Sequence, residues 1–120
     1  MFINFSNHPS SKWGDKQKDA AFAYGQIQDI SFPIVPATAT KDEVKGLAME
    51  YAEKISAYNP TCVMCQGEFS LAVAVIKLLQ KMHITCVCAC SDRVTTEVVQ
   101  ADGTMIKTSA FEFIQFREYI

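Results

Sequence analysis

The stretch Phe2-Ile3-Asn4-Phe5-Ser6, followed at once by Asn7-His8-Pro9-Ser10-Ser11-Lys12-Trp13, decides the fold class. Its first part is typical of a buried strand, which the polar segment ends. A second apolar run, Cys62-Val63-Met64-Cys65, gives way in the same manner to Gln66-Gly67-Glu68-Phe69-Ser70. Loops at the carboxyl ends of parallel strands form the ligand crevice of open α/β sheets. A loop that only packs has no need of these charged and polar side chains, so both loops indicate a site.

The rest of the chain alternates between helical and extended patterns. Gly14 and Gly25 bracket a helix over residues 15–24, and Thr40 with Glu43 forms a capping box before a second helix. The dipeptide Asp102-Gly103 is the strongest hairpin signal in the chain. Strands are expected at residues 2–6, 27–32, 61–65 and 84–90, a largely buried helix follows Gly67, a β-hairpin pairs residues 94–100 with 105–111, and a last extended stretch covers 112–120.

This order of elements predicts a Rossmann-like α/β fold, a three-layer sandwich with a mostly parallel sheet and a C-terminal β-hairpin. Right-handed crossovers give the strand order 2-1-3-4. The chain then reverses direction between the first and third strands, so both polar loops meet at the switch point. The segment Ser91-Asp92-Arg93, read as a loop after the fourth strand, is expected beside them.

Length and composition bound the class of protein. A chain of 120 residues with 49% apolar and 20% charged residues is one globular, soluble domain spanning 1–120. No apolar run is long enough to cross a membrane and no signal pattern opens the chain, so a cytoplasmic protein is expected. The formal charge of −2 argues against binding long nucleic acids, but a small anion can be held by local donors.

The five cysteines, an odd number, fit a reducing compartment. Cys86, Cys88 and Cys90 alternate along one strand, whereas Cys62 and Cys65 fall on opposite faces of another. This spacing lacks the knuckle turns of structural zinc sites, so the cysteines are interpreted as core residues. No metal site and no cofactor are predicted.

Four residues are the candidates for chemistry on an anionic ligand. Lys12 and Arg93 are the only basic residues placed near the crevice, and His8 carries the side-chain type that titrates near neutral pH. Ser11, like Ser10, can contact phosphate or serve only as a turn residue. The predicted catalytic set is therefore His8, Ser11, Lys12 and Arg93.

The remaining candidates are ligand contacts. Trp13 can stack on a base or anchor the packing of a helix start. Glu68 can read a ribose hydroxyl or an amine, or simply favour the helix dipole, and Gly67 permits close approach of a ligand. The predicted ligand-binding set is Asn7, Ser10, Trp13, Gln66, Gly67, Glu68, Phe69, Ser70 and Ser91.

Residues 4–13, Met64-Cys65-Gln66-Gly67-Glu68-Phe69 and residues 111–119 together resemble small stand-alone CRISPR-associated proteins of type III systems. Their fold is similar to the CARF (CRISPR-associated Rossmann) domain. The resemblance implies binding of a cyclic oligoadenylate, with cyclic tetra-adenylate as the expected ring. It also implies metal-independent cleavage, in which a ribose 2′-hydroxyl attacks the adjacent phosphate and leaves a 2′,3′-cyclic phosphate. Type III signalling would thereby be switched off.

Two other functions stay open at this point. The chain can sequester the same messenger without cleaving it, or it can be a flavodoxin-like module that holds a mononucleotide over Ser10 and Ser11. Ring messengers of even symmetry also suit a two-fold homodimer. The apolar tail from Phe111 to Ile120 is a candidate for the dimer contact, or it packs on its own sheet.

Overall fold

A single five-stranded sheet organises the computed structural model, which describes residues 1–120. The strand order is β2-β1-β3-β4-β5. The first four strands are parallel to one another and β5 runs antiparallel to β4, which confirms the predicted fold class and the order 2-1-3-4. The strands are β1 (Phe2–Ser6), β2 (Ile27–Ser31), β3 (Cys62–Cys65), β4 (Thr85–Val99) and β5 (Met105–Glu118).

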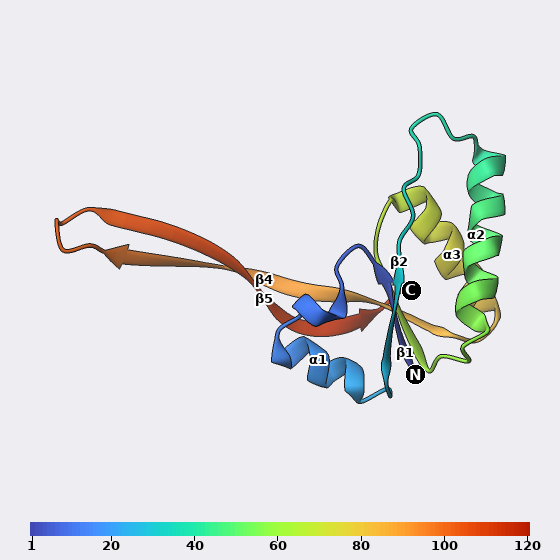
Figure 1. Ribbon diagram of the computed structural model, residues 1–120, viewed down its shortest axis with the longest axis horizontal. Helices are drawn as coiled ribbons and strands as arrows, with labels where there is room; N and C mark the ends of the chain where they lie inside the picture. The colour runs from blue at the N-terminus through green and yellow to red at the C-terminus, as the bar shows by residue number, and fades with distance from the viewer.

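Helices cover both faces of this sheet. The short helix η1 (Ser10–Lys12) and α1 (Asp15–Phe22) lie on one face, and α2 (Lys41–Ser56) and α3 (Phe69–Lys81) lie on the other (Figure 1). The predicted capping signal of α2 is present, because the Thr40 hydroxyl accepts a bond from the Glu43 N–H at 3.2 Å. The three layers of the sandwich are therefore as expected.

The core is divided between the two faces of the sheet. Because successive residues of a strand point to opposite faces, Phe5 enters the layer under α2 and α3, where its ring packs 4.7 Å from Phe32 and 5.2 Å from Tyr51. Phe2 enters the layer under α1, where it contacts Trp13. Two separate apolar clusters thus hold the helices against the sheet.

All five cysteines are free thiols, and three of them, Cys62, Cys65 and Cys86, are core residues as predicted. Cys62 and Cys65 lie in different core layers, so they do face opposite sides of β3. Cys86 joins the Cys65 layer, while Cys88 and Cys90 are half-buried. Burial in apolar surroundings raises the pKa of Cys62 and Cys65 to about 12 and that of Cys86 to about 11. These thiols are therefore protonated and chemically quiet at neutral pH.

The strands β4 and β5 extend far beyond the rest of the chain as a two-stranded ribbon (Figure 1). Every residue from Ser91 to Glu112 is exposed, and we call this segment the arm and the rest of the chain the body. The radius of gyration is 17.4 Å, whereas a compact chain of this length has about 14 Å. The molecule is therefore a small sandwich with a long projection.

The arm corrects two predictions. Ser91-Asp92-Arg93 is not a loop after the fourth strand, because β4 continues unbroken to Val99 and pairs with β5 throughout. The predicted hairpin and the predicted final stretch are likewise one strand, β5. A charged pair such as Asp92-Arg93 would end a strand whose two faces are buried. Both faces of the arm are in water, so the strand continues through this pair.

No helix in the structure is long and apolar enough to cross a membrane.

Candidate functional site

A crevice of about 910 Å³ opens at the carboxyl ends of β1 and β3. One wall is the loop that leads into η1 and α1, and the opposite wall is the root of the arm. The strand order of the sheet reverses direction between β1 and β3, and the sequence predicted a ligand crevice at this point. The lining residues are Asn7, His8, Pro9, Lys12, Trp13, Gly14, Asp15, Lys16, Gln17, Met64, Gln66, Ala89, Ser91, Phe111, Glu112 and Phe113.

Two buried polar residues of β1 hold the His8 loop in place. The Asn4 amide nitrogen donates to the His8 carbonyl at 2.8 Å, and the His8 N–H donates to the Ser6 hydroxyl at 3.2 Å. The Ser6 hydroxyl in turn donates to the side-chain oxygen Oδ1 of Asn4 at 2.6 Å. The backbone of His8 is therefore fixed, while the residue itself is exposed and lines the crevice.

Asp29 on β2 completes this anchor. Its carboxylate accepts from the Asn4 amide at 3.0 Å and from both the N–H and the hydroxyl of Ser10 at 3.1 Å. Asp29 was missed from the sequence, although a lone carboxylate in the strand at 27–32, in register with Asn4, was the available signal. Ser10 therefore uses its polar groups to tie the loop to the sheet.

Ser10 and Ser11 lie outside the crevice. Both line a separate, more open groove of about 400 Å³, together with Lys18 and Phe22 of α1. The structure therefore does not bring these two predicted contacts together with His8 and Lys12.

The crevice contains two lysines without an acidic partner. Lys12 and Lys16 both line it, and the one ion pair in the chain joins Lys107 to Glu97 in the arm. The carboxylates of Asp15 and Glu112 line it as well. A ligand here meets ammonium groups that suit phosphate and carboxylates that suit hydroxyl or amino groups.

Trp13 is a packing anchor whose surface also contributes to the crevice. Its side chain is buried, with its ring 6.2 Å from Phe2 and 6.3 Å from Phe116. These contacts fix the start of α1 against the sheet. Of the two interpretations made from the sequence, the packing role is the one that the structure displays.

Gln66 is the residue of the second polar loop that reaches the crevice. Its side-chain oxygen accepts from the Ala89 N–H at 2.6 Å, which fixes the amide group. Its own backbone N–H donates to the Phe5 carbonyl at 3.1 Å. The side-chain NH₂ group is then available as a donor in the crevice.

The residues after Gln66 have structural partners and do not line the crevice. Glu68 caps α3, accepting from the N–H of Leu71 at 2.8 Å and of Ser70 at 3.0 Å. These bonds, together with one from the Ser70 hydroxyl, lower the pKa of Glu68. Gly67 lies against Phe32, since a Cβ at this position would stand 2.6 Å from the ring. Phe69 is exposed.

The arm contributes Ser91, but not Arg93, to the crevice. Arg93 donates to the Ser109 hydroxyl at 3.1 Å on the neighbouring strand. Of the two predicted basic contacts, the crevice therefore receives only Lys12. The lining residues that the sequence did not predict are Pro9, Gly14, Asp15, Lys16, Gln17, Met64, Ala89, Phe111, Glu112 and Phe113.

The aromatic tail packs mostly on its own sheet. Phe116 lies 5.0 Å from Phe2, and the Tyr119 hydroxyl donates to the Cys65 carbonyl at 2.7 Å. Burial raises the pKa of Tyr119 to about 12. Phe111 and Ile120 remain exposed, so only part of the tail is free for another contact.

Comparison with known proteins identifies a family. The family model described as the Uncharacterized protein MJ1673 family matches residues 1–117, so the chain belongs to that family. No curated protein and no solved structure matches the chain.

Proposed function

We propose that the crevice binds a cyclic oligoadenylate, with cyclic tetra-adenylate as the expected ring, and that the chain cleaves it. The observation that carries this proposal is the meeting of unpaired Lys12 and Lys16 with the aromatic rings of Phe111 and Phe113 in one crevice. Phosphates need cationic donors, and adenine rings stack on aromatic side chains. The Glu112 carboxylate suits the exocyclic amine of adenine or a ribose hydroxyl.

The proposed cleavage needs one proton acceptor and one cation. The ribose 2′-oxygen attacks the adjacent phosphorus and loses its proton, the bond from phosphorus to the 5′-oxygen breaks, and that oxygen takes up a proton. The products end in a 2′,3′-cyclic phosphate and a 5′-hydroxyl. The His8 imidazole is assigned the proton transfers, and the Lys12 ammonium stabilises the charge that develops on phosphate.

Sequestration without cleavage is the second candidate, and one observation favours it. Of the four residues predicted to be catalytic, Ser11 and Arg93 do not line the crevice. Binding alone needs the lysines, the amides and the aromatic rings. A flavodoxin-like site finds no such support, because the Ser10 hydroxyl is bonded to Asp29.

A homodimer is proposed as the working form, since a two-fold axis suits a ring of even symmetry.

The test is calorimetric titration with cyclic tri-, tetra- and hexa-adenylate in EDTA, followed by chromatography of the same mixtures. We expect saturable binding of one ring and release of linear product. His8→Ala is expected to lower the single-turnover rate by about 10²–10⁴-fold while binding is kept. Tight binding without linear product would select sequestration, and absence of binding to every ring would overturn the proposal.

A further inference from the structure

The Gln66 side chain extends the hydrogen bonding between β3 and β4. The pairing of these two strands ends at Met64 and Val87, and β3 itself ends at Cys65. Two residues further along β4, the Ala89 N–H donates to the side-chain oxygen Oε1 of Gln66 at 2.6 Å. Gln66 therefore supplies an acceptor to β4 at the point where the backbone of β3 leaves the sheet.

This bond fixes the orientation of the Gln66 amide. A backbone N–H can only donate, so it holds the oxygen and leaves the NH₂ group free. The nitrogen Nε2 makes no hydrogen bond within the chain, and no side-chain nitrogen is both buried and without a partner. Nε2 is therefore accessible, and because Gln66 lines the crevice, it is a fixed donor there.

The crevice has an uncharged inner part. Six of its lining residues are buried or half-buried, and we call them the floor: Trp13, Gln17, Met64, Gln66, Ala89 and Phe113. The rings of Phe113 and Phe116 lie 4.9 Å apart, which supports the Phe113 ring from the side of the sheet. The floor thus offers apolar surface, aromatic rings and neutral donors.

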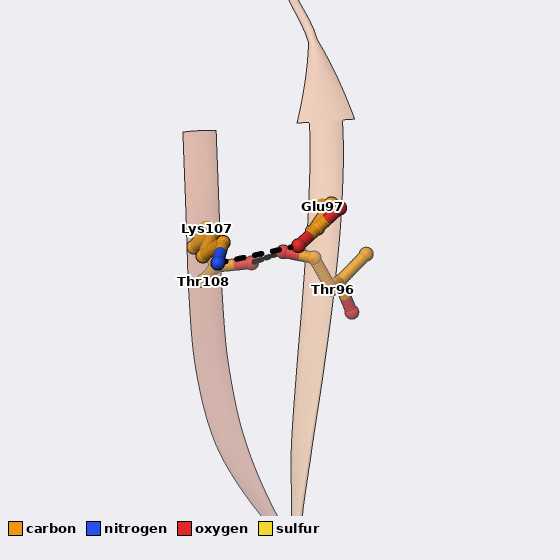
Figure 2. A network of polar contacts seen from close by, with 4 residues as sticks. All are labelled: Thr96, Glu97, Lys107 and Thr108. Carbon is orange, nitrogen blue, oxygen red and sulfur yellow. Dashed lines mark hydrogen bonds and ion pairs between the residues drawn. The ribbon is translucent and has the colours of Figure 1, made fainter. Parts of the chain in front are cut away.

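The charges lie at the exposed part of the crevice, which we call the mouth. Every charged residue of the lining is exposed, including Lys12 and Lys16. The one ion pair of the chain joins Glu97 to Lys107 in the arm (Figure 2), so the ammonium groups of both mouth lysines are free for a ligand.

We infer that adenine binds on the floor, where the Gln66 NH₂ group donates to a ring nitrogen of the base, and that the phosphates lie with the lysines at the mouth. A phosphate on the floor would lose its water without gaining a cation, which is costly. Adenine has apolar faces, and its unprotonated ring nitrogens accept hydrogen bonds. This inference rests on the proposed function, to which it adds the orientation of the ligand and the residue that recognises the base.

Gln17 is the other amide of the floor, but its side chain is held less firmly. Its nitrogen Nε2 lies 4.0 Å from the Met64 sulfur, which is a weak acceptor. A donor that a backbone bond already fixes loses less freedom when the ligand binds. The amide of Gln66 is therefore assigned the contact with the base.

Deaza analogues of adenosine 5′-monophosphate (AMP) test this contact one atom at a time. Each analogue has a carbon in place of N1, N3 or N7, which removes one acceptor and keeps the phosphate. In NMR titrations of wild type, one of the three is expected to bind about 3–10-fold more weakly than AMP, because one neutral hydrogen bond is lost. Equal affinity for AMP and all three analogues would overturn the inference.

The variant Gln66→Glu attributes this loss to Gln66. Glutamate keeps an acceptor for the Ala89 N–H, but at pH 8 it has no proton to donate. It is therefore expected to bind the sensitive analogue as well as it binds AMP. Gln17→Glu adds the same charge to the same floor and is expected to retain the loss, with native circular dichroism checked in both variants. A loss that persists in Gln66→Glu, or that disappears in Gln17→Glu, would overturn the inference.

Titration of wild type with cyclic tetra-adenylate separates this inference from the proposed function. If the ring binds and the Gln66 comparison fails, only the contact between Gln66 and the base is overturned. If the ring does not bind and the AMP comparison succeeds, the adenine contact is supported and the proposed function is overturned. A wild type that binds neither the ring nor AMP would overturn both.

Discussion

Strands β4 and β5 run through both the body and the arm, and the two regions differ in what covers these strands. Up to Cys90, β4 lies between helices on both faces, and its residues are buried or half-buried. From Ser91 onward, the same ladder of backbone hydrogen bonds continues with every side chain exposed. The comparison teaches that strand pairing alone does not make a core: the covering layer does, and the arm has none within its chain.

The boundary between the two regions is where the candidate site lies. The register of β4 and β5 shifts between Cys90 and Ser91, leaving Ile114 as an extra residue in β5. Such bulges bend a strand and re-aim its side chains. Ser91 and Phe113, the first pair beyond the bulge, both line the crevice. The arm thus supplies one wall of a site whose other wall belongs to the body.

The largest expected contrast is between two phenylalanines. Phe5 is fully buried in the body, and Phe111 is 79% exposed on the arm. Phe5→Ala is expected to lower the free energy of unfolding by about 3–5 kcal/mol, whereas Phe111→Ala is expected to change it by about 0.5 kcal/mol or less. Urea denaturation measures both, and equal losses would contradict the division into body and arm.

The next contrast concerns ligand affinity. Lys12 lines the crevice, whereas Arg93 is bonded to Ser109 within the arm. Lys12→Ala is expected to cost about 1.5–3 kcal/mol of binding free energy, because a charge-assisted bond to phosphate is lost. Arg93→Ala is expected to leave affinity unchanged. Titrations at two salt concentrations test this, and a loss confined to Arg93→Ala would move the anion site onto the arm.

A smaller contrast compares two aspartates. Asp29 holds Ser10 and Asn4 by hydrogen bonds, while Asp92 projects from the exposed arm. Asp29→Ala is expected to destabilise the chain by about 1 kcal/mol and to weaken ligand binding, because the His8 loop loses its anchor. Asp92→Ala serves as the control and is expected to alter neither unfolding nor binding. Unchanged binding in Asp29→Ala would show that the anchor does not position the site.

The smallest contrast is in pH dependence. Bonds from the Leu71 and Ser70 N–H groups lower the pKa of Glu68 in the body, and bonds from the Thr104 hydroxyl and N–H lower that of Asp102 in the arm. For a lowered pKa, the stabilisation is complete above the unfolded value and is lost as pH falls through the folded value. Glu68→Gln is expected to reduce the acid sensitivity of global unfolding, whereas Asp102→Asn is expected to affect only the turn. Denaturation at a series of acidic pH values distinguishes them.

The body was predictable because its signals are local. The capping pair Thr40 and Glu43 and the polar residues after β1 and β3 each act within a few positions of the chain. The arm was misread at Asp92-Arg93, since polarity ends a buried strand but not an exposed one. Counting outward from a three-residue turn over residues 101–103, which contains Asp102-Gly103, pairs Arg93 with Phe111 and gives the continuous ribbon.

The location of the crevice followed from topology, but the partners of its side chains did not. Ser10 is occupied by Asp29 from another strand, and Gly67 is required by the ring of Phe32. These partners are distant in sequence, so no local pattern contains them. The same holds for Phe111 and Glu112, which line the crevice because the root of the arm lies beside the loop that leads into η1 and α1.

Hydrogen exchange with and without cyclic tetra-adenylate, at one protein concentration, tests the central claim most directly. Added ligand is expected to slow exchange in residues 7–17, 64–66 and 111–113, which contain the crevice lining of the body and the arm root. The outer arm, residues 94–108, is expected to be unchanged by ligand. Protection confined to the outer arm, or absent from the crevice segments at saturating ligand, would contradict the account.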